Sequence, residues 1–321
     1  MKILEKLKDK TVVVTGASGY IGSALVSALV EKSCSVIRIS RKSLSDSSNV
    51  TSIKEDISTA IAWNEIVSRA DIIFHLAGNT SLYAASDDPG KSLNSTVLPI
   101  NHLIRASKDC QRKIRVVYAS TATVYGMTTK RPVSEIRQPR PVTIYDLHKY
   151  FAEKQLALGS EQGLFDAVSL RLANVYGPSP ELSASLDRGI LNRATSLAMR
   201  GQALTLFGDG KYVRDYVYIS DVINAFLLAG VAPDLRGRVL NVGSGVGTTV
   251  LQAFQTVIAE VAKCLGHCVN IDHVEWPINS DPIERRNFTA DIAKLCSLGW
   301  RPSIDLRSGI DKLIADSISL K

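Results

Sequence analysis

Long apolar runs are absent from this chain of 321 residues: none reaches the ~18 consecutive positions that a membrane-spanning helix needs. The opening stretch, MKILEKLKDK, is charged throughout and has no apolar core, so it does not match a signal peptide. We therefore expect a cytoplasmic protein with no membrane partner. Apolar residues make up 45% of the chain and charged residues 21%, which is typical of a soluble globular protein.

Cysteine is scarce, and its count is odd. The five cysteines are scattered along the chain, which argues against a disulfide framework. The segment CLGHC at 264–268 places His267 between two of them, but no second pair of ligands follows at a spacing typical of zinc sites. We therefore expect no metal site. The cysteines are Cys34, Cys110, Cys264, Cys268 and Cys296.

The chain has fewer acidic than basic residues. It contains 31 Asp and Glu and 38 Lys and Arg, which gives a net charge of +7. Basic residues cluster at 105–115 and 130–140, and we interpret these segments as solvent-exposed surface. The alternative is that their positive electrostatic field attracts an anionic substrate. Aromatic residues amount to 6%, and none interleaves with these charges as a stacking platform for nucleic acid requires. We expect no nucleic-acid partner.

The chain does have a regular alternation of strand-like and helix-like segments up to about residue 175. β-Branched and apolar runs predict buried strands, and segments with apolar residues at helical spacing, such as 20–33, lie between them. The predicted strands are 11–16, 35–40, 71–78, 113–121 and 165–177. This order predicts an α/β fold, a doubly wound (Rossmann-type) parallel sheet with helices on both faces.

The alternation breaks after Asn174, where the chain becomes rich in Gly, Pro and Ser. We predict that the later segments form a smaller C-terminal lobe, which binds the substrate and closes a cleft at the carboxyl ends of the strands. The dinucleotide-binding domain then comprises residues 1–173 with about 213–250, and the substrate-binding lobe comprises 174–212 and 251–321.

The segment TGASGYIG joins the first predicted strand to the first predicted helix. Gly16 permits a tight turn, Gly19 lets the backbone approach a pyrophosphate, and Gly22 allows the helix to pack closely on the strand. Three glycines alone are a weak signal. Their place between a strand and a helix near the N-terminus is typical of a dinucleotide-binding site.

The segment YDLHK places Tyr145 and Lys149 four residues apart, on one face of a predicted helix. A lysine ammonium beside a phenol lowers the pKa of the phenol, which makes it a general acid or base usable near neutral pH. The segment YASTATVYG ends a predicted strand with the hydroxyls of Ser120, Thr121 and Thr123. These hydroxyls either bind a substrate carbonyl or alcohol, or simply cap the strand end.

Together with HLAG, RLANVYGP, GDGKYVRDYVYISDV and LGWRPSIDLRSGI, these motifs resemble the extended short-chain dehydrogenase/reductase family, in its nucleotide-sugar epimerase/dehydratase branch. The resemblance runs from about residue 10 to about residue 312. It implies an NAD(P)-dependent enzyme that acts on a nucleotide sugar. The motifs are specific for the family and not for the substrate.

The resemblance also implies roles for individual residues. Thr121 matches the substrate-binding hydroxyl residue, Tyr145 matches the proton-transferring tyrosine, and Lys149 matches the lysine that lowers the tyrosine pKa and holds the nicotinamide ribose. The other residues of the implied cofactor site are Gly16, Ser18, Gly19, Tyr20, Ile21, Gly22, Ser40, Arg41, Asp56, Ile57, Leu76, Ala77 and Gly78.

The substrate site implied by the resemblance includes two residues for the diphosphate, Asn174 and Arg214. A second phosphate-binding arginine of the family is missing, because Asp281 stands in its place. Arg285 or Arg286 is expected to take over that role, and we assign it to Arg285. The expected substrate-binding residues are thus Thr80, Thr121, Asn174, Arg214 and Arg285.

A pair of acids is missing as well. Dehydratases of this family carry Asp-Glu directly after the active-site Thr and need both to eliminate water from the sugar. The corresponding residues here are Ala122 and Thr123. Their identity argues against dehydration.

The predicted cofactor site also lacks the acidic residue that usually ends the second strand. A strand like 35–40 usually ends in an Asp or Glu that accepts hydrogen bonds from the adenosine ribose of NAD, but here Ser40 is followed by Arg41 and Lys42. Arg41 can pair with a 2′-phosphate, so we expect NADP, with NAD as the alternative. The other interpretation is an exposed turn whose charges contact nothing.

These absences lead to a hypothesis about the reaction. We expect NADPH-dependent reduction of a nucleotide-linked keto-sugar, of the 4-keto-6-deoxyhexose class of deoxysugar biosynthesis, with Tyr145 as the proton donor. The first alternative is an NAD-dependent nucleotide-sugar 4-epimerase, because STATVYG is similar to that subgroup; the second is a catalytically silent dinucleotide-binding protein. The resemblance further implies a homodimer that pairs helices at about 94–109 and 145–160.

Overall fold

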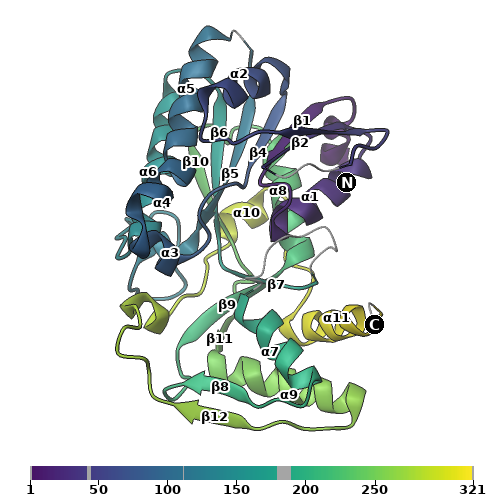
Figure 1. Ribbon diagram of the computed structural model, residues 1–321, viewed down its shortest axis with the longest axis vertical. Coiled ribbons are helices and arrows are strands. Elements are labelled where there is room, and N and C mark those ends of the chain that lie inside the picture. Colours follow the sequence, from purple (N-terminus) through teal and green to yellow (C-terminus); the bar gives the residue numbers. More distant parts are fainter. Residues whose placement is uncertain (1, 42–44, 111, 179–188, 320–321) are drawn as a thin grey trace.

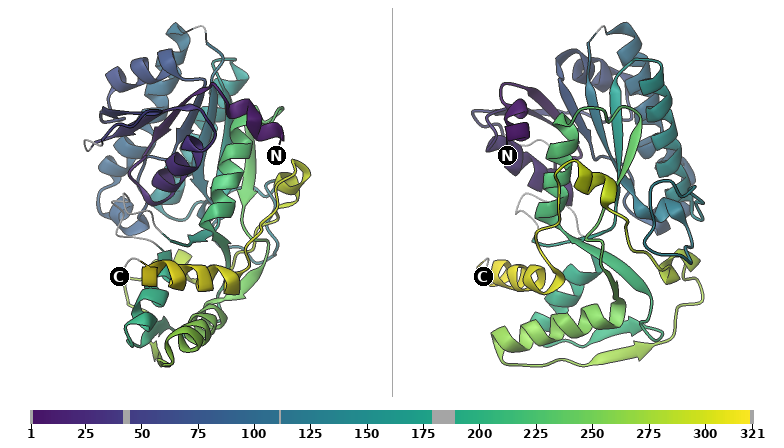
Figure 2. Two further views of the ribbon diagram at one scale, coloured as in Figure 1. Left: turned by 90° about the vertical axis from the view of Figure 1, so that its right-hand side faces the viewer. Right: turned by 180° about the vertical axis from the view of Figure 1, so that it is seen from behind.

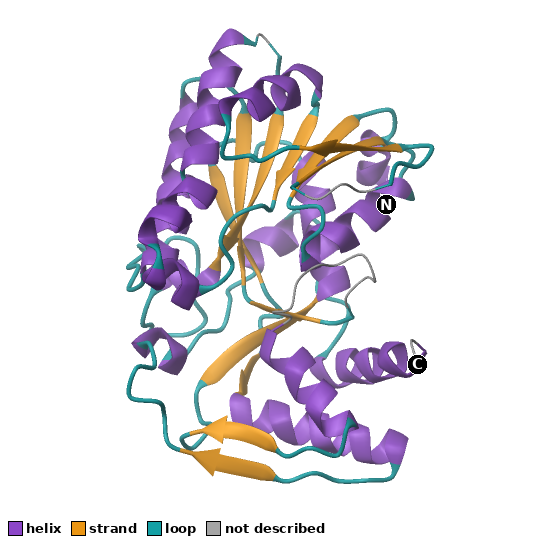
Figure 3. Cartoon of the chain, viewed as in Figure 1, coloured by secondary structure: helices purple, strands orange, loops and turns teal. Residues whose placement is uncertain are grey.

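The computed structural model describes residues 2–41, 45–110, 112–178 and 189–319. The chain forms a large sheet with helices on both faces and, below it in Figure 1, a smaller lobe. Figure 2 shows the same two parts from the side and from behind, and Figure 3 distinguishes their helices and strands. Within the described ranges, no helix has both the length and the apolar character that crossing a bilayer demands.

The large sheet is entirely parallel. Its strands are β1 (Thr11–Thr15), β2 (Ser35–Ser40), β3 (Val50–Lys54), β4 (Ile72–His75), β5 (Arg115–Thr121), β6 (Asp166–Leu172) and β10 (Arg238–Val242). Their order across the sheet is β10-β6-β5-β4-β1-β2-β3. The inner strands are continuous buried runs rich in β-branched residues, such as TVVVT in β1, as expected where helices cover both faces. The predicted doubly wound fold is confirmed.

Helices cover both faces of this sheet. On one face lie α1 (Tyr20–Val30) and α8 (Ile219–Val231), and on the other lie α2 (Ala60–Arg69), α5 (Leu98–Asp109) and α6 (Ile144–Glu161). Neighbouring residues of β1 show the division: Val12 belongs to the same core as Leu25 of α1, whereas Val13 belongs to the core around Trp63 of α2. This alternation follows from the two-residue period of a strand.

β1 and β4 are neighbours in the sheet, although β2 and β3 come between them in the sequence. The chain leaves β1 toward one edge of the sheet and returns at β4 to build the other half. In open parallel sheets, ligands bind in the crevice at this point, outside the carboxyl ends of the strands. The glycine turn follows β1 and the HLAG segment follows β4, so both border the crevice.

The smaller lobe holds two small sheets and the helices packed against them. Its strands are β7 (Asn174–Tyr176), β8 (Leu204–Phe207), β9 (Val213–Tyr218), β11 (Gly247–Thr249) and β12 (Ile271–Val274), and its helices are α7 (Gly189–Met199), α9 (Val250–Leu265) and α11 (Leu306–Ser319). The sheet orders are β11-β9-β7 and β12-β8. α9 packs against both α7 and α11.

Two predicted segments differ in detail from the structure, and a third lies mainly outside the described residues. The strand predicted at 165–177 is divided at Ala173 into β6, in the large sheet, and β7, in the sheet of β9 and β11. Within 213–250, β10 joins the large sheet and α8 packs against it, whereas β9 pairs with β7 and β11. The Gly-, Pro- and Ser-rich stretch lies mainly at 179–188, outside the described residues. The domain boundaries stay a prediction.

Short elements complete the described part of the chain, and three of them contribute residues to the cleft described in the next subsection. They are η1 (Lys2–Leu7), α3 (Leu82–Asp87), α4 (Pro89–Thr96), η2 (Ala122–Tyr125), η3 (Pro282–Arg285) and α10 (Ala293–Ser297). η2 begins directly after β5, and η3 carries Arg285. The helix predicted at 94–109 is interrupted, since α4 ends at Thr96 and α5 begins at Leu98.

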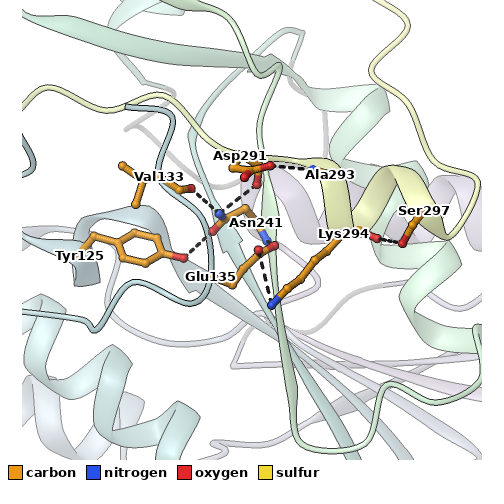
Figure 4. Close-up of polar contacts among 8 residues, drawn as sticks. All are labelled: Tyr125, Val133, Glu135, Asn241, Asp291, Ala293, Lys294 and Ser297. Atoms are coloured by element: carbon orange, nitrogen blue, oxygen red, sulfur yellow. Dashed lines mark hydrogen bonds and ion pairs between the residues drawn. The ribbon is translucent and has the colours of Figure 1, made fainter. Parts of the chain in front are cut away.

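Asn241, near the end of β10, joins segments that are far apart in the sequence (Figure 4). Its side chain accepts a hydrogen bond from the Tyr125 hydroxyl at 2.8 Å and donates to the main-chain oxygens of Val133 at 2.8 Å and Asp291 at 3.1 Å. Its main-chain N–H donates to Glu135 Oε1 at 2.9 Å. The residue is fully buried, so each bond satisfies a group that would be costly to leave unpaired. These bonds fix the segment after η3 beside η2.

Candidate active site

The turn between β1 and α1 is shaped for close approach by a ligand. Gly16 has φ +69°, and a Cβ there would lie 2.7 Å from the main-chain nitrogen of Ala77. A Cβ on Gly22 would lie 2.1 Å from the carbonyl oxygen of Gly16, so both positions require glycine. α1 begins after Gly19, which provides no side-chain cap, so no cap occupies the positive end of the helix dipole. These features fit the pyrophosphate of a dinucleotide.

The end of β2 lies against this turn. Ser40 Oγ donates to Ser18 Oγ over 3.4 Å. Arg41 is exposed and close enough to Asp56 to help lower the pKa of that carboxyl, although the hydrogen bond from the Ser58 N–H contributes most. Arg41 therefore lies near Asp56, directly after the end of β2.

The segment after β4 packs against the end of β1. The N–H groups of Leu76 and Ala77 donate to the carbonyl oxygen and the hydroxyl of Thr15, each at 3.3 Å. On α1, the Tyr20 hydroxyl donates to the carbonyl oxygen of Gly177 at 2.8 Å, which links the glycine turn to the end of β7. The structure thus brings the segments after β1, β2 and β4 together, and the cofactor contacts of Gly16, Ser18, Gly19, Tyr20, Ile21, Gly22, Ser40, Arg41, Asp56, Ile57, Leu76, Ala77 and Gly78 stay a prediction.

Tyr145 and Lys149 lie one turn apart near the start of α6. Tyr145 lines a cleft, whereas Lys149 is buried and donates from Nζ to the carbonyl oxygen of Ala119 in β5 at 2.9 Å. Burial lowers the pKa of Lys149 to about 8, against the opposing effect of Glu153. The ammonium is therefore fixed at the carboxyl end of β5, and its proton is labile at mildly alkaline pH.

The hydroxyls that end β5 face different surroundings. Ser120 donates to the buried carboxylate of Glu153 at 2.5 Å, and Glu153 in turn pairs with Arg171 at 2.6 Å. Thr121 and Thr123 line the cleft, and their hydroxyls lie 2.8 Å apart. Of the predicted hydroxyl cluster, Ser120 therefore belongs to the core, and the two threonines belong to the site.

A carboxylate from α6 reaches these threonines. Asp146 accepts a hydrogen bond from the Thr123 hydroxyl and another from the Thr143 hydroxyl, the latter at 2.8 Å. The residue is only 1% exposed, and this burial raises its pKa. The family motif predicts acids only directly after Thr121, at positions 122 and 123, so it does not reveal Asp146.

The cleft is large, about 1350 Å³, and extends from the sheet into the smaller lobe. Its walls combine hydroxyl groups, aromatic rings and both acidic and basic side chains. Among the predicted substrate residues, those that line it are Thr80, Thr121, Asn174 and Arg214. The site therefore brings together segments separated by more than half of the chain.

Two arginines lie together in this cleft. Arg214 is buried and donates to the carbonyl oxygens of Glu284, at 2.5 Å, and of Arg286. Burial, followed by the neighbouring charge of Arg286, lowers the pKa of Arg214 to about 9. Arg286 donates to Asn174 Oδ1 at 3.4 Å. Within the described part of the chain, neither guanidinium forms an ion pair with a carboxylate, which leaves their charge for an anionic ligand.

Arg285, to which the sequence analysis assigned the missing phosphate contact, is directed elsewhere. Its guanidinium lies 5.1 Å from the ring centroid of Trp276 and donates to Ser280 Oγ at 2.9 Å. Trp276 lines the cleft and stacks on Phe207 with ring centroids 5.3 Å apart. Arg285 therefore supports an aromatic wall, whereas Arg286 lines the cleft itself. The assignment to Arg285 stays a prediction that this geometry does not favour.

The crevice, the glycine turn and the group of Thr121, Tyr145 and Lys149 define a dinucleotide-binding enzyme of the Rossmann type. The chain belongs to the NAD dependent epimerase/dehydratase family, whose model matches residues 12–243. The resemblance drawn from the motifs is thereby confirmed, and so is the prediction of an enzyme.

Individual proteins resemble the chain over nearly its whole length. It is 28% identical to a UDP-glucose 4-epimerase of Mycolicibacterium smegmatis over 94% of this chain and 96% of that protein. A crystal structure of UDP-glucose 4-epimerase from Thermotoga maritima with UDP-glucose has a TM-score of 0.85 at 28% identity and covers 97% of this chain and 99% of that one. MoeE5 in complex with UDP-glucuronic acid and NAD has a TM-score of 0.84 at 28% identity, with coverage of 97% and 100%.

Proposed function

We propose that this enzyme is a nucleotide-sugar 4-epimerase, which inverts C4 of a hexose linked to a nucleoside diphosphate. The observation that carries the proposal is the lining of one cleft, with Thr121 and Tyr145 in one part and Arg214 and Arg286 in another. The first pair suits a sugar hydroxyl, and the second suits a diphosphate. The absence of acids at 122–123 argues against a dehydratase.

The similar proteins favour this proposal over the keto-sugar reductase that the sequence first indicated. Two of those described above are named UDP-glucose 4-epimerases, and UDP-glucose is present in the Thermotoga maritima structure. We therefore infer a UDP-hexose as the first substrate to test. The reductase remains the second candidate function.

The residues of the site divide the chemistry between them. A nicotinamide cofactor bound at the glycine turn would supply the hydride acceptor and donor. Tyr145 takes the proton of the sugar hydroxyl during oxidation and returns it during reduction, as a general base and then a general acid. The positive charge of Lys149 favours the phenolate form of Tyr145. Thr121 binds the same sugar oxygen and holds it at Tyr145.

Inversion requires the ketone to present its other face before it is reduced. The cleft has a volume of about 1350 Å³, so it is large enough for a nucleotide sugar as a whole. Arg214 and Arg286 would retain the diphosphate meanwhile. This division between a held diphosphate and a free sugar is what a 4-epimerase needs.

The test is incubation with UDP-glucose, UDP-galactose and other UDP-hexoses in the presence of catalytic amounts of cofactor, followed by NMR of the products. A 4-epimerase converts each substrate and its C4 epimer to the same equilibrium mixture. The proposal is overturned if no UDP-hexose is epimerised while a UDP-linked keto-sugar is reduced with stoichiometric loss of NADPH.

A specific observation favours the reductase as the second candidate. Ser40 replaces the acid that would accept hydrogen bonds from the ribose of NAD, and Arg41 beside it is exposed. A guanidinium at this position pairs with the 2′-phosphate of NADP, a cofactor that reductive enzymes consume. Cofactor preference is therefore an independent measurement that bears on the choice of reaction.

We also infer a homodimer built on α6. Leu147, Phe151 and Leu158 of this helix are 50%, 51% and 55% exposed, and they recur at helical spacing on its surface. Leu93 of α4, which packs beside α6, is 44% exposed. A second copy of the chain would cover this apolar face, in keeping with the helix pairing implied by the family resemblance.

A further inference from the structure

A buried ion pair lies behind the strand that ends at Thr121. Arg171 of β6 donates twice to Glu153 of α6, from Nε to Oε1 at 3.0 Å and from Nη2 to Oε2 at 2.6 Å. The two side chains are only 4% and 2% exposed. Compared with apolar residues of similar volume, a buried ion pair often adds no stability, because both charges lose their hydration. Stability alone therefore does not account for this pair.

Glu153 also ties α6 to β5. Its Oε1 accepts a hydrogen bond from the Ser120 hydroxyl at 2.5 Å. One turn earlier on α6, Lys149 donates to the carbonyl oxygen of Ala119 at 2.9 Å. Two successive turns of the helix thus contact two successive residues of the strand, which fixes the helix along the strand. Tyr145 lies one turn earlier again, on the same side of α6.

Arg171 contacts the chain on the other side of Thr121. Its guanidinium lies 4.7 Å from the ring centroid of Tyr125 in η2, and the Tyr125 hydroxyl donates to Asn241 Oδ1 at 2.8 Å. Ser120 directly precedes Thr121, and Tyr125 follows it by four residues. The ion pair therefore holds both ends of the short segment that carries the Thr121 hydroxyl.

We propose that Glu153 is a positioning residue, which holds Tyr145 and Thr121 at the spacing that the reaction needs. Its carboxylate joins the helix of Tyr145 to the strand of Thr121, and Arg171 supplies the positive charge that keeps a carboxylate ionised in the core. Glu153 does not line the cleft, so it acts through Ser120 and the helix. The inference rests on the proposed function only for the substrate of the kinetic assay.

Ser120→Ala breaks the contact between Glu153 and β5 and leaves the ion pair in place. It should lower kcat for a UDP-hexose roughly 10²-fold, the loss expected when reacting groups are displaced by about 1 Å. KM should change little, because Arg214 and Arg286 are untouched. The matched control is Ser107→Ala: Ser107 is also 4% exposed, and its hydroxyl has no hydrogen-bond partner within the described residues. Wild-type kcat in Ser120→Ala, or an equal loss in the control, would overturn the proposal.

A pair of double variants tests the carboxylate itself. Removing Glu153 alone would leave Arg171 charged and unpaired in the core, so each change is combined with Arg171→Met, since replacing both partners often costs no stability. Glu153→Leu with Arg171→Met should melt near the wild-type temperature, bind the cofactor normally and lose kcat as Ser120→Ala does. Glu153→Gln with Arg171→Met keeps an acceptor for the Ser120 hydroxyl and should retain most of kcat. Equal activity of the two double variants would contradict the proposal.

Amide hydrogen exchange, measured by mass spectrometry, tests the positioning without any substrate. Residues 144–153 should exchange faster in Ser120→Ala than in the wild type, because this part of α6 has lost one of its contacts with β5. The same segment should be unchanged in Ser107→Ala. Equal exchange of this segment in Ser120→Ala and the wild type would refute the proposal. Because no turnover is involved, the result decides the role of Glu153 even if UDP-hexoses prove not to be substrates.

Discussion

Lys149 donates from Nζ to the carbonyl oxygen of Ala119 at 2.9 Å, so a buried ammonium on α6 is tied to the strand that ends at Thr121. Tyr145 lies one turn before Lys149 on the same helix. The bond therefore sets the position of the helix against β5, and with it the position of both catalytic candidates.

Tyr145→Phe should keep the cofactor and lose turnover. The ring remains, but the group that exchanges the proton is gone, and general acid–base catalysis contributes roughly 10²–10⁴-fold. The matched control is Tyr150→Phe, one turn farther along α6, which should stay near the wild-type rate. Steady-state kinetics with cofactor titration provide the measurement. Turnover of Tyr145→Phe within a factor of a few of wild type would exclude Tyr145 as the acid and base.

Alkaline pH should reduce kcat through Lys149. Its pKa is lowered to about 8 by burial, so the ammonium is charged below that pH and becomes neutral as the pH rises through it. The neutral amine no longer favours the phenolate of Tyr145, so the rate falls. A rate that stays constant up to pH ~10, near the ordinary pKa of lysine, would contradict this assignment.

Arg286 and Arg285 are adjacent in the sequence, and exchanging each for alanine should have different effects. Arg286→Ala should raise KM for the UDP-hexose about 10- to 150-fold, because one charged hydrogen bond to the diphosphate is lost. Arg285→Ala should affect KM less, since its guanidinium packs on Trp276. Equal effects of the two substitutions, or a larger one at Arg285, would restore the original assignment to Arg285.

Arg41 tests the cofactor preference. If its guanidinium pairs with a 2′-phosphate, Arg41→Ala should weaken NADPH about 10- to 150-fold and leave NADH nearly unchanged. Ser40→Asp should reverse the preference, because it restores the acceptor for the ribose and repels the phosphate. Fluorescence titration of both cofactors against the three proteins gives the affinities. If the wild-type enzyme binds NADH as tightly as NADPH, Arg41 does not bind a 2′-phosphate and is only an exposed turn residue. That result would strengthen the epimerase proposal.

The exposed face of α6 tests the homodimer. Phe151 is 51% exposed in the single chain, and Phe151→Glu places a charge in the proposed interface. The variant should become monomeric at micromolar concentration by light scattering. Ile136→Glu is the control, because Ile136 is 85% exposed and lies outside α6. A wild-type monomer would contradict the dimer directly.

Much of the fold could be predicted from the sequence because it depends on local patterns. Buried β-branched runs alternate with amphipathic helices, and this order leaves few arrangements other than a parallel sheet. The strand at 165–177 was predicted as one element because the apolar pattern continues through Ala173. Its division into β6 and β7 depends on partners, since β7 pairs with β9 some 40 residues later in the chain.

The parts of the site that were missed depend on contacts between distant segments. Thr123 and Asp146 are 23 residues apart, so a search for acids directly after Thr121 does not find this carboxylate. Arg285 and Arg286 follow each other at the end of the short helix η3, where neighbouring side chains point in different directions. Nothing in their identity distinguishes the arginine that faces the cleft from the one that stacks on Trp276.

The central claim is that hydrogen leaves C4 of the sugar and returns to C4 on the other face. It is tested most directly with a UDP-hexose that carries deuterium at C4, incubated with a catalytic amount of unlabelled cofactor and analysed by NMR and mass spectrometry. The expected product is the C4 epimer with its deuterium retained at C4. Recovery of unchanged substrate under conditions where a UDP-linked keto-sugar is reduced by NADPH would contradict it.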